Sequence, residues 1–172
     1  SSAASDVYKR QVSVSAVESV LGSSDAQTLT LLTASLIALS SVDTIIGTDG
    51  SDTVRLLGTD SVSVSAVESV LGSSDAQTLT LLTASLIALS SVDTIIGTAN
   101  SDTVRLLGTD SVSVSAVESV LGSSDAQTLT LLTASLIALS SVDTVIGTDG
   151  SDTVRLLGTD SVSVSAVESV LG

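Results

Sequence analysis

The chain has 172 residues, of which 43% are apolar, yet it contains no Phe, Trp, Met, Cys, His or Pro. Its net charge of −14 disfavours nucleic acid and anionic membrane surfaces as partners and favours cations. No apolar run approaches the roughly 18 residues of a membrane span, so we expect no membrane insertion. Lys9 is the only Lys, and without His or Cys the chain lacks the usual catalytic nucleophiles and bases. We therefore expect a protein that is not an enzyme.

Residues 1–11 (SSAASDVYKRQ) share no pattern with the rest of the chain and contain its only Lys and its only Tyr. This string resembles the in-frame translation of a transposase-based sequencing adapter. We expect residues 1–11 to be a disordered, non-native tail and residues 12–172 to be one solenoid fragment of a longer protein. Such a fragment has no polar cap at either end, which predicts end-to-end self-association.

From Val12 onward the sequence repeats with a period of 50 residues. The exchange of Gly50 for Asn100 between copies predicts a left-handed backbone there, because Gly and Asn adopt positive φ at the lowest cost. A weaker repeat of half that length lies within the first, so that Val17 aligns with Val42 and Gly22 with Gly47. Periods of this size indicate a stacked array, in which each unit is covered by its neighbours.

Each 25-residue unit contains three short segments with the alternation and β-branched residues of strands. They are 12–14, 17–21 and 28–31, which align with 37–39, 42–46 and 53–56. Three strands per unit predict an all-β fold, a right-handed parallel β-helix with about 25 residues per coil. Aligned residues would then stack about 4.8 Å apart as ladders, Val17 on Val42 and Leu31 on Leu56.

A solenoid of strands alternating with short helices is the alternative fold. Residues 15–18 (SAVE) fit a helix capping box, and residues 33–41 (TASLIALSS) have helical spacing. The segment aligned to the capping box is SSVDTIIG, whose β-branched residues disfavour a helix. Since aligned positions of a solenoid share a conformation, the all-strand fold is preferred.

One loop in each 50-residue repeat carries a candidate metal site. Residues 47–55 (GTDGSDTVR) resemble the calcium-binding nonapeptide of repeat-in-toxin proteins, with Thr48 in place of its second glycine. The resemblance implies Ca²⁺ bound by loop carbonyls and carboxylates and shared between successive turns. The candidate ligands are Asp49, Asp52, Asp102, Asp149 and Asp152. In the aligned half-repeat Gln27 replaces Asp52, so the alternative is that these residues only form turns.

An acidic residue also occupies one position in every 25-residue unit. These residues are Glu18, Asp43, Glu68, Asp93, Glu118, Asp143 and Glu168. In a solenoid of 25-residue coils they would form a row of like charges about 4.8 Å apart, which a bound cation would relieve. The alternative is a solvated acidic edge that keeps the rod soluble.

The wider pattern, V-[DE]-[ST] and two aliphatic residues before Gly, resembles the repeat regions of very large bacterial surface and adhesin-like proteins. That resemblance implies an extracellular or cell-surface protein with a structural or adhesive role, as a stalk or scaffold, and an extracellular protein or glycan as partner. One alternative is a calcium-binding module that folds only with its ion. Another is the non-catalytic part of a carbohydrate-active β-helix protein.

Overall fold

The structure is a computed structural model that describes residues 10–15, 19–22, 27–33, 36–58, 61–73, 77–83, 86–108, 111–123, 127–158 and 161–172. Within these residues the chain forms β-strands and no helix. Residues 1–9 of the expected tail lie outside the described residues, while Arg10 and Gln11 begin the first strand.

The strands form two parallel sheets of ten strands each, sheet A from the odd-numbered and sheet B from the even-numbered strands. Sheet A comprises β1 (Arg10–Val14), β3 (Gln27–Leu31), β5 (Thr44–Ile46), β7 (Ser61–Ser65), β9 (Thr78–Leu81), β11 (Thr94–Ile96), β13 (Ser111–Ser115), β15 (Thr128–Leu131), β17 (Thr144–Ile146) and β19 (Ser163–Ser165). Sheet B comprises β2 (Ser19–Leu21), β4 (Leu36–Ser40), β6 (Thr53–Leu56), β8 (Ser69–Leu71), β10 (Leu86–Ser90), β12 (Thr103–Leu106), β14 (Ser119–Leu121), β16 (Leu136–Ser140), β18 (Thr153–Leu156) and β20 (Ser169–Leu171).

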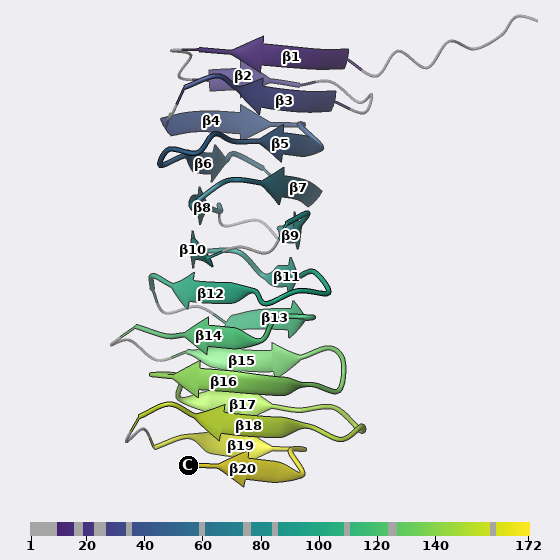
Figure 1. Cartoon of the computed structure of the whole chain (residues 1–172), viewed down its shortest axis with the longest axis vertical. Helices are drawn as coiled ribbons and strands as arrows, with labels where there is room; N and C mark the ends of the chain where they lie inside the picture. The colour runs from purple at the N-terminus through teal and green to yellow at the C-terminus, as the bar shows by residue number, and fades with distance from the viewer. Residues whose placement is uncertain are drawn as a thin grey trace, which may run out of the picture.

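The chain passes from sheet A to sheet B and back, and each coil contains one strand of each sheet (Figure 1). This confirms the predicted all-β parallel solenoid. The helical alternative is wrong where the structure describes it, because residues 36–40 form β4, and residues 66–68 and 116–118, which align with the capping box, form turns.

The coils are shorter than the sequence repeat predicted, with about 17 residues in each rather than about 25. In sheet A, Val12 pairs with Leu29, Leu29 with Ile45 and Ile45 with Val64, and each of these pairs joins one coil to the next. A 25-residue unit has three strands and a coil has two, so one unit spans one and a half coils. Three coils therefore accommodate one 50-residue repeat.

The predicted ladder of Leu31 on Leu56 is wrong for the same reason, whereas Val17 of the other ladder lies outside the described residues. Leu31 of β3 lies in sheet A, and its aligned residue Leu56 of β6 lies in sheet B. Leu31 instead pairs with Val14, and Leu56 with Leu39. The period of the sequence shows how often a pattern recurs. It does not show how many strands complete a coil, because that number depends on how the strands pack.

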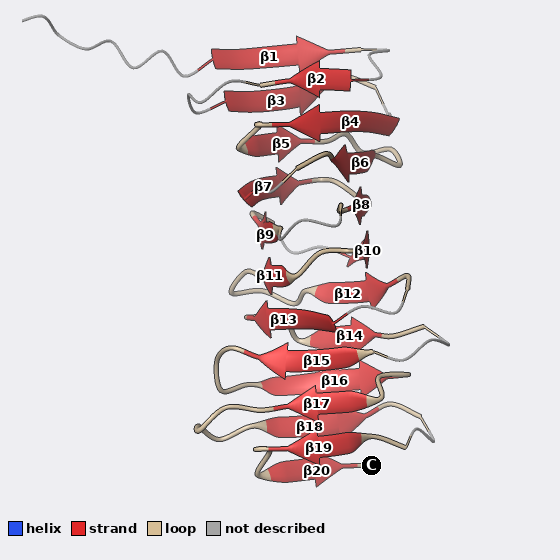
Figure 2. Ribbon diagram, turned by 180° about the vertical axis from the view of Figure 1, so that it is seen from behind, coloured by secondary structure: helices blue, strands red, loops and turns tan. Residues whose placement is uncertain are grey.

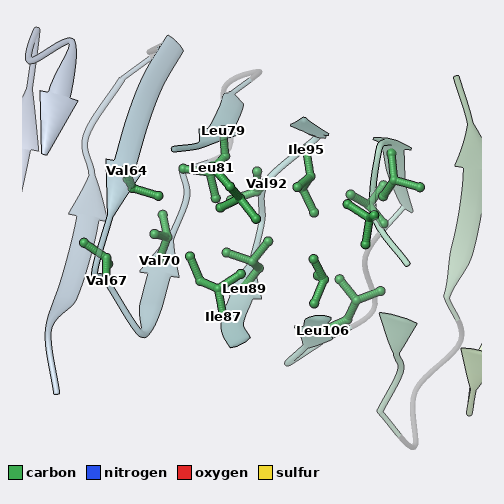
Figure 3. Close-up of a cluster of buried hydrophobic side chains, with 14 of the residues drawn as sticks. Val64, Val67, Val70, Leu79, Leu81, Ile87, Leu89, Val92, Ile95 and Leu106 are labelled. Atoms are coloured by element: carbon green, nitrogen blue, oxygen red, sulfur yellow. The ribbon is translucent and has the colours of Figure 1, made fainter. Parts of the chain in front are cut away.

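The core is a single layer of aliphatic side chains between the two sheets. Leu79 and Ile95 of sheet A and Ile87 of sheet B are each 0% exposed. Figure 3 shows side chains of the two sheets pointing toward one another across the interior. Each fully buried side chain of this size contributes about 1.5–3 kcal/mol. So thin an interior is filled by Val, Leu and Ile, which explains why aromatic residues are dispensable.

The two sheets wind around the long axis. In Figure 1 the strands nearest the viewer belong to sheet A at the N-terminal end, from β1 to β5, and to sheet B at the C-terminal end, from β16 to β20. Figure 2 gives the same arrangement from behind. Ten strands about 4.8 Å apart give a rod about 45 Å long, and the right-handed twist of its strands makes each face helical.

The predicted left-handed backbone at Gly50 and Asn100 is wrong. The described residues with positive φ are Ser41, Ala66, Ser91, Ala116, Ser141 and Ala166, which occupy one aligned position of the half-repeat. Gly50 and Asn100 form the same turn, in which the hydroxyl of Thr48 or Thr98 accepts a hydrogen bond from the backbone N–H two residues later, at 3.0 Å in both copies. Both residues supply the N–H that such a turn uses.

The left-handed residues explain the recurrent glycines. The carbonyl of Ala116 approaches Gly97 on the preceding coil so closely that an added Cβ at Gly97 would overlap its oxygen. Ser41 approaches Gly22 in the same way. Each of these glycines provides room for the backbone of the next coil rather than unusual dihedral angles.

The substitution Ala116→Gly is expected to stabilise the protein by about 1 kcal/mol, because an L-residue with positive φ is strained. Ala138→Gly, in the middle of β16, is the matched control and is expected to destabilise it by about 0.5–1 kcal/mol. Urea denaturation followed by circular dichroism measures both. Equal destabilisation by the two substitutions would contradict the assignment of strain to Ala116.

Candidate functional site: the buried corner carboxylates

The candidate metal-binding residues lie in loops 47–52, 97–102 and 147–152, which lead from sheet A to sheet B. Asp49 and Asp149 are exposed. Asp52, Asp102 and Asp152 are each 0% exposed. The five predicted residues therefore belong to two environments, an exposed loop tip and a buried corner.

The buried carboxylate organises its own loop. The Oδ2 atom of Asp52 accepts hydrogen bonds from the backbone N–H of Thr48 at 2.6 Å and from the Thr48 hydroxyl at 2.8 Å. The corresponding distances are 2.6 and 2.9 Å for Asp102, and 2.6 and 2.8 Å for Asp152. Buried carboxylates require such donors, because an unpaired buried charge is very costly.

Each corner also connects neighbouring coils. The Oδ1 atom of Asp152 accepts the backbone N–H of Ser135 on the preceding coil at 2.9 Å. On the following coil, a carboxylate oxygen of Glu168 accepts the N–H of Asp152 at 2.6 Å, while the carbonyl of Asp152 accepts the N–H of Ser169 at 3.1 Å. We call this set of contacts the carboxylate clamp. It holds three successive coils together.

The clamp changes the acidity of its central group. Burial by itself raises the pKa of Asp152, but hydrogen bonds from the Thr148 N–H, the Ser135 N–H and the Thr148 hydroxyl stabilise the charged form and outweigh it. The net effect lowers the pKa of Asp152 below its ordinary value. Asp152 is therefore held in its ionised form as a hydrogen-bond acceptor.

The opposite edge of the solenoid has an equivalent clamp built on Gln. Gln77, which is 1% exposed, donates from Nε2 to the Gly58 carbonyl at 2.8 Å, and its Oε1 accepts the N–H of Ser73 at 3.0 Å. Its own N–H is accepted by Asp93 on the following coil at 2.9 Å. Gln127 makes the same contacts, with Gly108, Ser123 and Asp143.

The preceding coil explains why aligned positions alternate between Gln and Asp. It offers a carbonyl of Gly58 to Gln77, so the buried side chain must donate. It offers the N–H of Ser135 to Asp152, so the buried side chain must accept. The change from Asp to Gln weakened the sequence-based case for calcium, and here it follows from hydrogen-bond complementarity.

Sequence analysis did not identify the hydroxyl partners of these clamps. The available signal was a Ser or Thr four residues before each buried polar residue, Thr48 before Asp52 and Ser73 before Gln77. The partners on neighbouring coils, Ser135 and Gly58, could not be found without the coil length.

The predicted row of closely spaced acids is also wrong. Asp43 follows a sheet B strand and Glu68 a sheet A strand, so acids of successive units lie at opposite edges. Acids of this row that share an edge are three coils, or about 14 Å, apart. Each described acid of the row accepts a backbone hydrogen bond instead, as Asp43 accepts the N–H of Gln27 at 2.8 Å and Glu68 that of Asp52 at 2.7 Å.

The geometry of the loops limits how they could bind calcium. Candidate loops recur only every third coil, so they cannot share an ion between successive turns. Among the described residues, no three carboxylates gather in an arrangement suited to a metal ion. An ion at Asp52 would have to displace the two Thr48 donors from Oδ2. Calcium binding at these loops stays a prediction.

The substitution Asp152→Asn is expected to destabilise the protein by about 1–3 kcal/mol, because the new amide group would face N–H donors in a buried corner. Asp149→Asn, in the same loop but exposed, is the control and should change stability by less than about 0.5 kcal/mol. Denaturant titration of both variants measures the difference. A result in which the two variants are equally stable would contradict the clamp.

The clamp also predicts a pH dependence. Because the folded pKa of Asp152 is lowered, its contribution is complete above the unfolded value of about 3.9 and is lost as pH falls through the folded value. Acid titrations at constant temperature should show a steeper loss of stability below about pH 4 for the native chain than for Asp152→Asn. Parallel curves would exclude this contribution.

Comparison of the chain with protein-family models, curated proteins and solved structures found no match. In the residues that the structure describes there is no helix long and apolar enough to span a membrane. What the structure supports is a β-solenoid of repeated coils with polar clamps at both edges.

Proposed function

We propose that this chain is a structural, non-enzymatic segment, a stalk or scaffold, of a secreted or cell-surface repeat protein. The observation that supports this proposal is the recurrence of the same clamp in each repeat. In every copy the Thr N–H lies 2.6 Å from the Asp carboxylate, and the Thr hydroxyl lies 2.8 or 2.9 Å from it. An active site is a single constellation, whereas a stalk needs a unit that can be repeated without change.

The physical properties of the coil suit a stalk. Backbone hydrogen bonds run along the whole rod, because every strand pairs with the strand one coil away. A coil buries its aliphatic face only against its neighbours, so stability grows with the number of coils. The clamps add polar contacts that span three coils. The acids at the turns keep such rods soluble.

An adhesive role, with an extracellular protein or glycan as partner, belongs to the same proposal. It rests on the resemblance to adhesin-like repeat regions and on the regularity of the two outer faces. A rigid rod of this kind presents the same surface pattern many times, which favours multivalent binding.

Deletion of residues 62–111 tests the scaffold, because it removes three coils and restores the sequence at the junction. The variant is expected to remain folded and to be shorter by about 14 Å, as measured by small-angle X-ray scattering. Deletion of residues 61–77 is the matched control, since it removes one coil together with Glu68 and Gln77 and leaves Asp52 without its acceptor. It should unfold at lower urea concentration despite being the longer chain. Loss of the rod after deletion of 62–111 would overturn the proposal.

The calcium-binding alternative is favoured by one observation, the exposed Asp49 beside the buried Asp52 in one loop. The chain contains its own control, because the middle copy has Ala99 and Asn100 at the positions of Asp49 and Gly50. A site that needs the exposed carboxylate would therefore occur in the first and third copies only.

Thermal melting followed by circular dichroism, in millimolar Ca²⁺ and in excess chelator, separates the two functions. For a scaffold we expect the same strand content and melting temperature in both. A large rise in melting temperature with Ca²⁺ would instead support the calcium module. Calorimetric titration then gives the stoichiometry: two ions per chain would assign binding to Asp49 and Asp149, and three to the buried residues.

A further inference from the structure

The three arginines beyond Arg10 lie on one face of the solenoid. Arg55 of β6, Arg105 of β12 and Arg155 of β18 are exposed on the outer side of sheet B. In the part of the chain that the structure describes, none of their guanidinium groups has a hydrogen bond or an ion pair. A chain with 19 acids thus leaves these three arginines without acidic partners among the described residues.

The residues beside each arginine are apolar. Arg105 is flanked by Ala88 and Leu121 on the neighbouring strands. Leu86, at the start of β10, is 67% exposed. We call this surface the arginine face. It comprises Arg55, Arg105 and Arg155 together with the Ala and Leu residues that pair with them on the neighbouring strands.

The outer side of sheet A is different, although the two halves of the repeat share one type of core. Thr80 occupies the position that aligns with Arg105, and Ser61 the position that aligns with Leu86. Sheet A therefore presents mostly hydroxyl groups, and sheet B presents Leu, Ala and Arg as well as Ser and Thr. Ser61 and Thr80 lie in strands of sheet A at the aligned positions. A strand at these positions therefore does not require arginine or an exposed leucine.

A surface complementary to the arginine face exists on the chain itself. The edge where sheet A leads to sheet B has the exposed acid Glu68 and the half-exposed Leu82, and the opposite edge has Asp93 and Leu107. Both sets recur with the 50-residue period of the arginines, or about every 14 Å along the rod. An edge of one copy and the face of another are therefore opposite in charge, both contain exposed leucine, and recur with the same spacing.

We propose that the arginine face binds an acidic edge of a second copy of this chain, so that the rods associate side by side. Arginine faces packed against each other would oppose like charges, which leaves the edge as the complementary surface. The contact is heterologous and can continue from copy to copy into a bundle. Since each face is helical, paired rods wind around one another. This inference goes beyond the scaffold role and does not depend on it.

Individual surface ion pairs are weak, so the association relies on several acting together. Each chain contributes Arg55, Arg105 and Arg155 to one contact, which makes the binding multivalent. Salt should weaken it strongly, because the Debye length falls to about 3 Å at 1 M ionic strength.

Sedimentation velocity of the full chain at low salt and in 1 M NaCl tests the proposal, together with the cross-sectional radius from small-angle X-ray scattering. We expect the mass and the cross-section at least to double at low salt and to return to single-rod values in high salt. End-to-end association would raise the mass and leave the cross-section unchanged, so the two modes are distinguishable.

The triple variant Arg55→Thr, Arg105→Thr, Arg155→Thr should retain the circular dichroism spectrum and remain a single rod in cross-section, because Thr already occupies the aligned positions of sheet A. The control with Lys at the same three positions keeps the charge and should still associate. A native chain with a single-rod cross-section at low salt would overturn the proposal, as would a Thr variant that associates like the native chain. Arginine-dependent binding of polyglutamate by a chain that stays a single rod would overturn it too, and would assign the face to another acidic partner.

Discussion

Each coil of the solenoid contains two strands, whereas each 25-residue unit of sequence contains three. Most other features depend on this mismatch. Successive units are turned by half a coil, so aligned residues alternate between sheet A and sheet B and between the two edges. The mismatch converts one repeated sequence into two different faces. It also keeps the acids of the repeated row, such as Glu68 and Glu118, three coils apart on each edge, where a 25-residue coil would have stacked them next to one another.

The polar residues at the corners solve a problem that stacking creates. A corner leaves backbone groups of three successive coils pointing toward the same buried space, and each must find a partner. Asp152 supplies acceptors where the preceding coil offers an N–H, and Gln77 supplies donors where it offers a carbonyl. Such complementary contacts fix which coil follows which. The layers of the uniform aliphatic core are otherwise interchangeable. The corner contacts therefore define the register of the coils.

The outer surfaces are where the two halves of the repeat differ most. Inside the solenoid both halves of the repeat supply Val, Leu and Ile, so both fill the core with the same types of side chain. Outside, sheet A presents mostly hydroxyl groups, and sheet B presents arginine beside Leu and Ala as well as Ser and Thr. A structural rod with one face of each kind has a preferred side for contacts. The proposed scaffold role and the proposed association with further copies are therefore compatible, because both use the same period.

The sequence by itself determined the strands, the parallel stacking and the aliphatic core, because alternation and period are local properties of the chain. It also marked Asp52 and its copies as unusual, and only the structure shows that the Asp52 carboxylate accepts hydrogen bonds from Thr48. Only the tertiary structure decided that two strands complete a coil, since that number depends on how two sheets close over a thin core. The partners of Asp152 and Gln77, the left-handed backbone at Ala116 and the separation of the arginines from the acids all follow from that closure. The hydrogen bonds of Asp152 and Gln77 to neighbouring coils join residues 16 to 19 positions apart. This spacing does not occur as a period of the sequence.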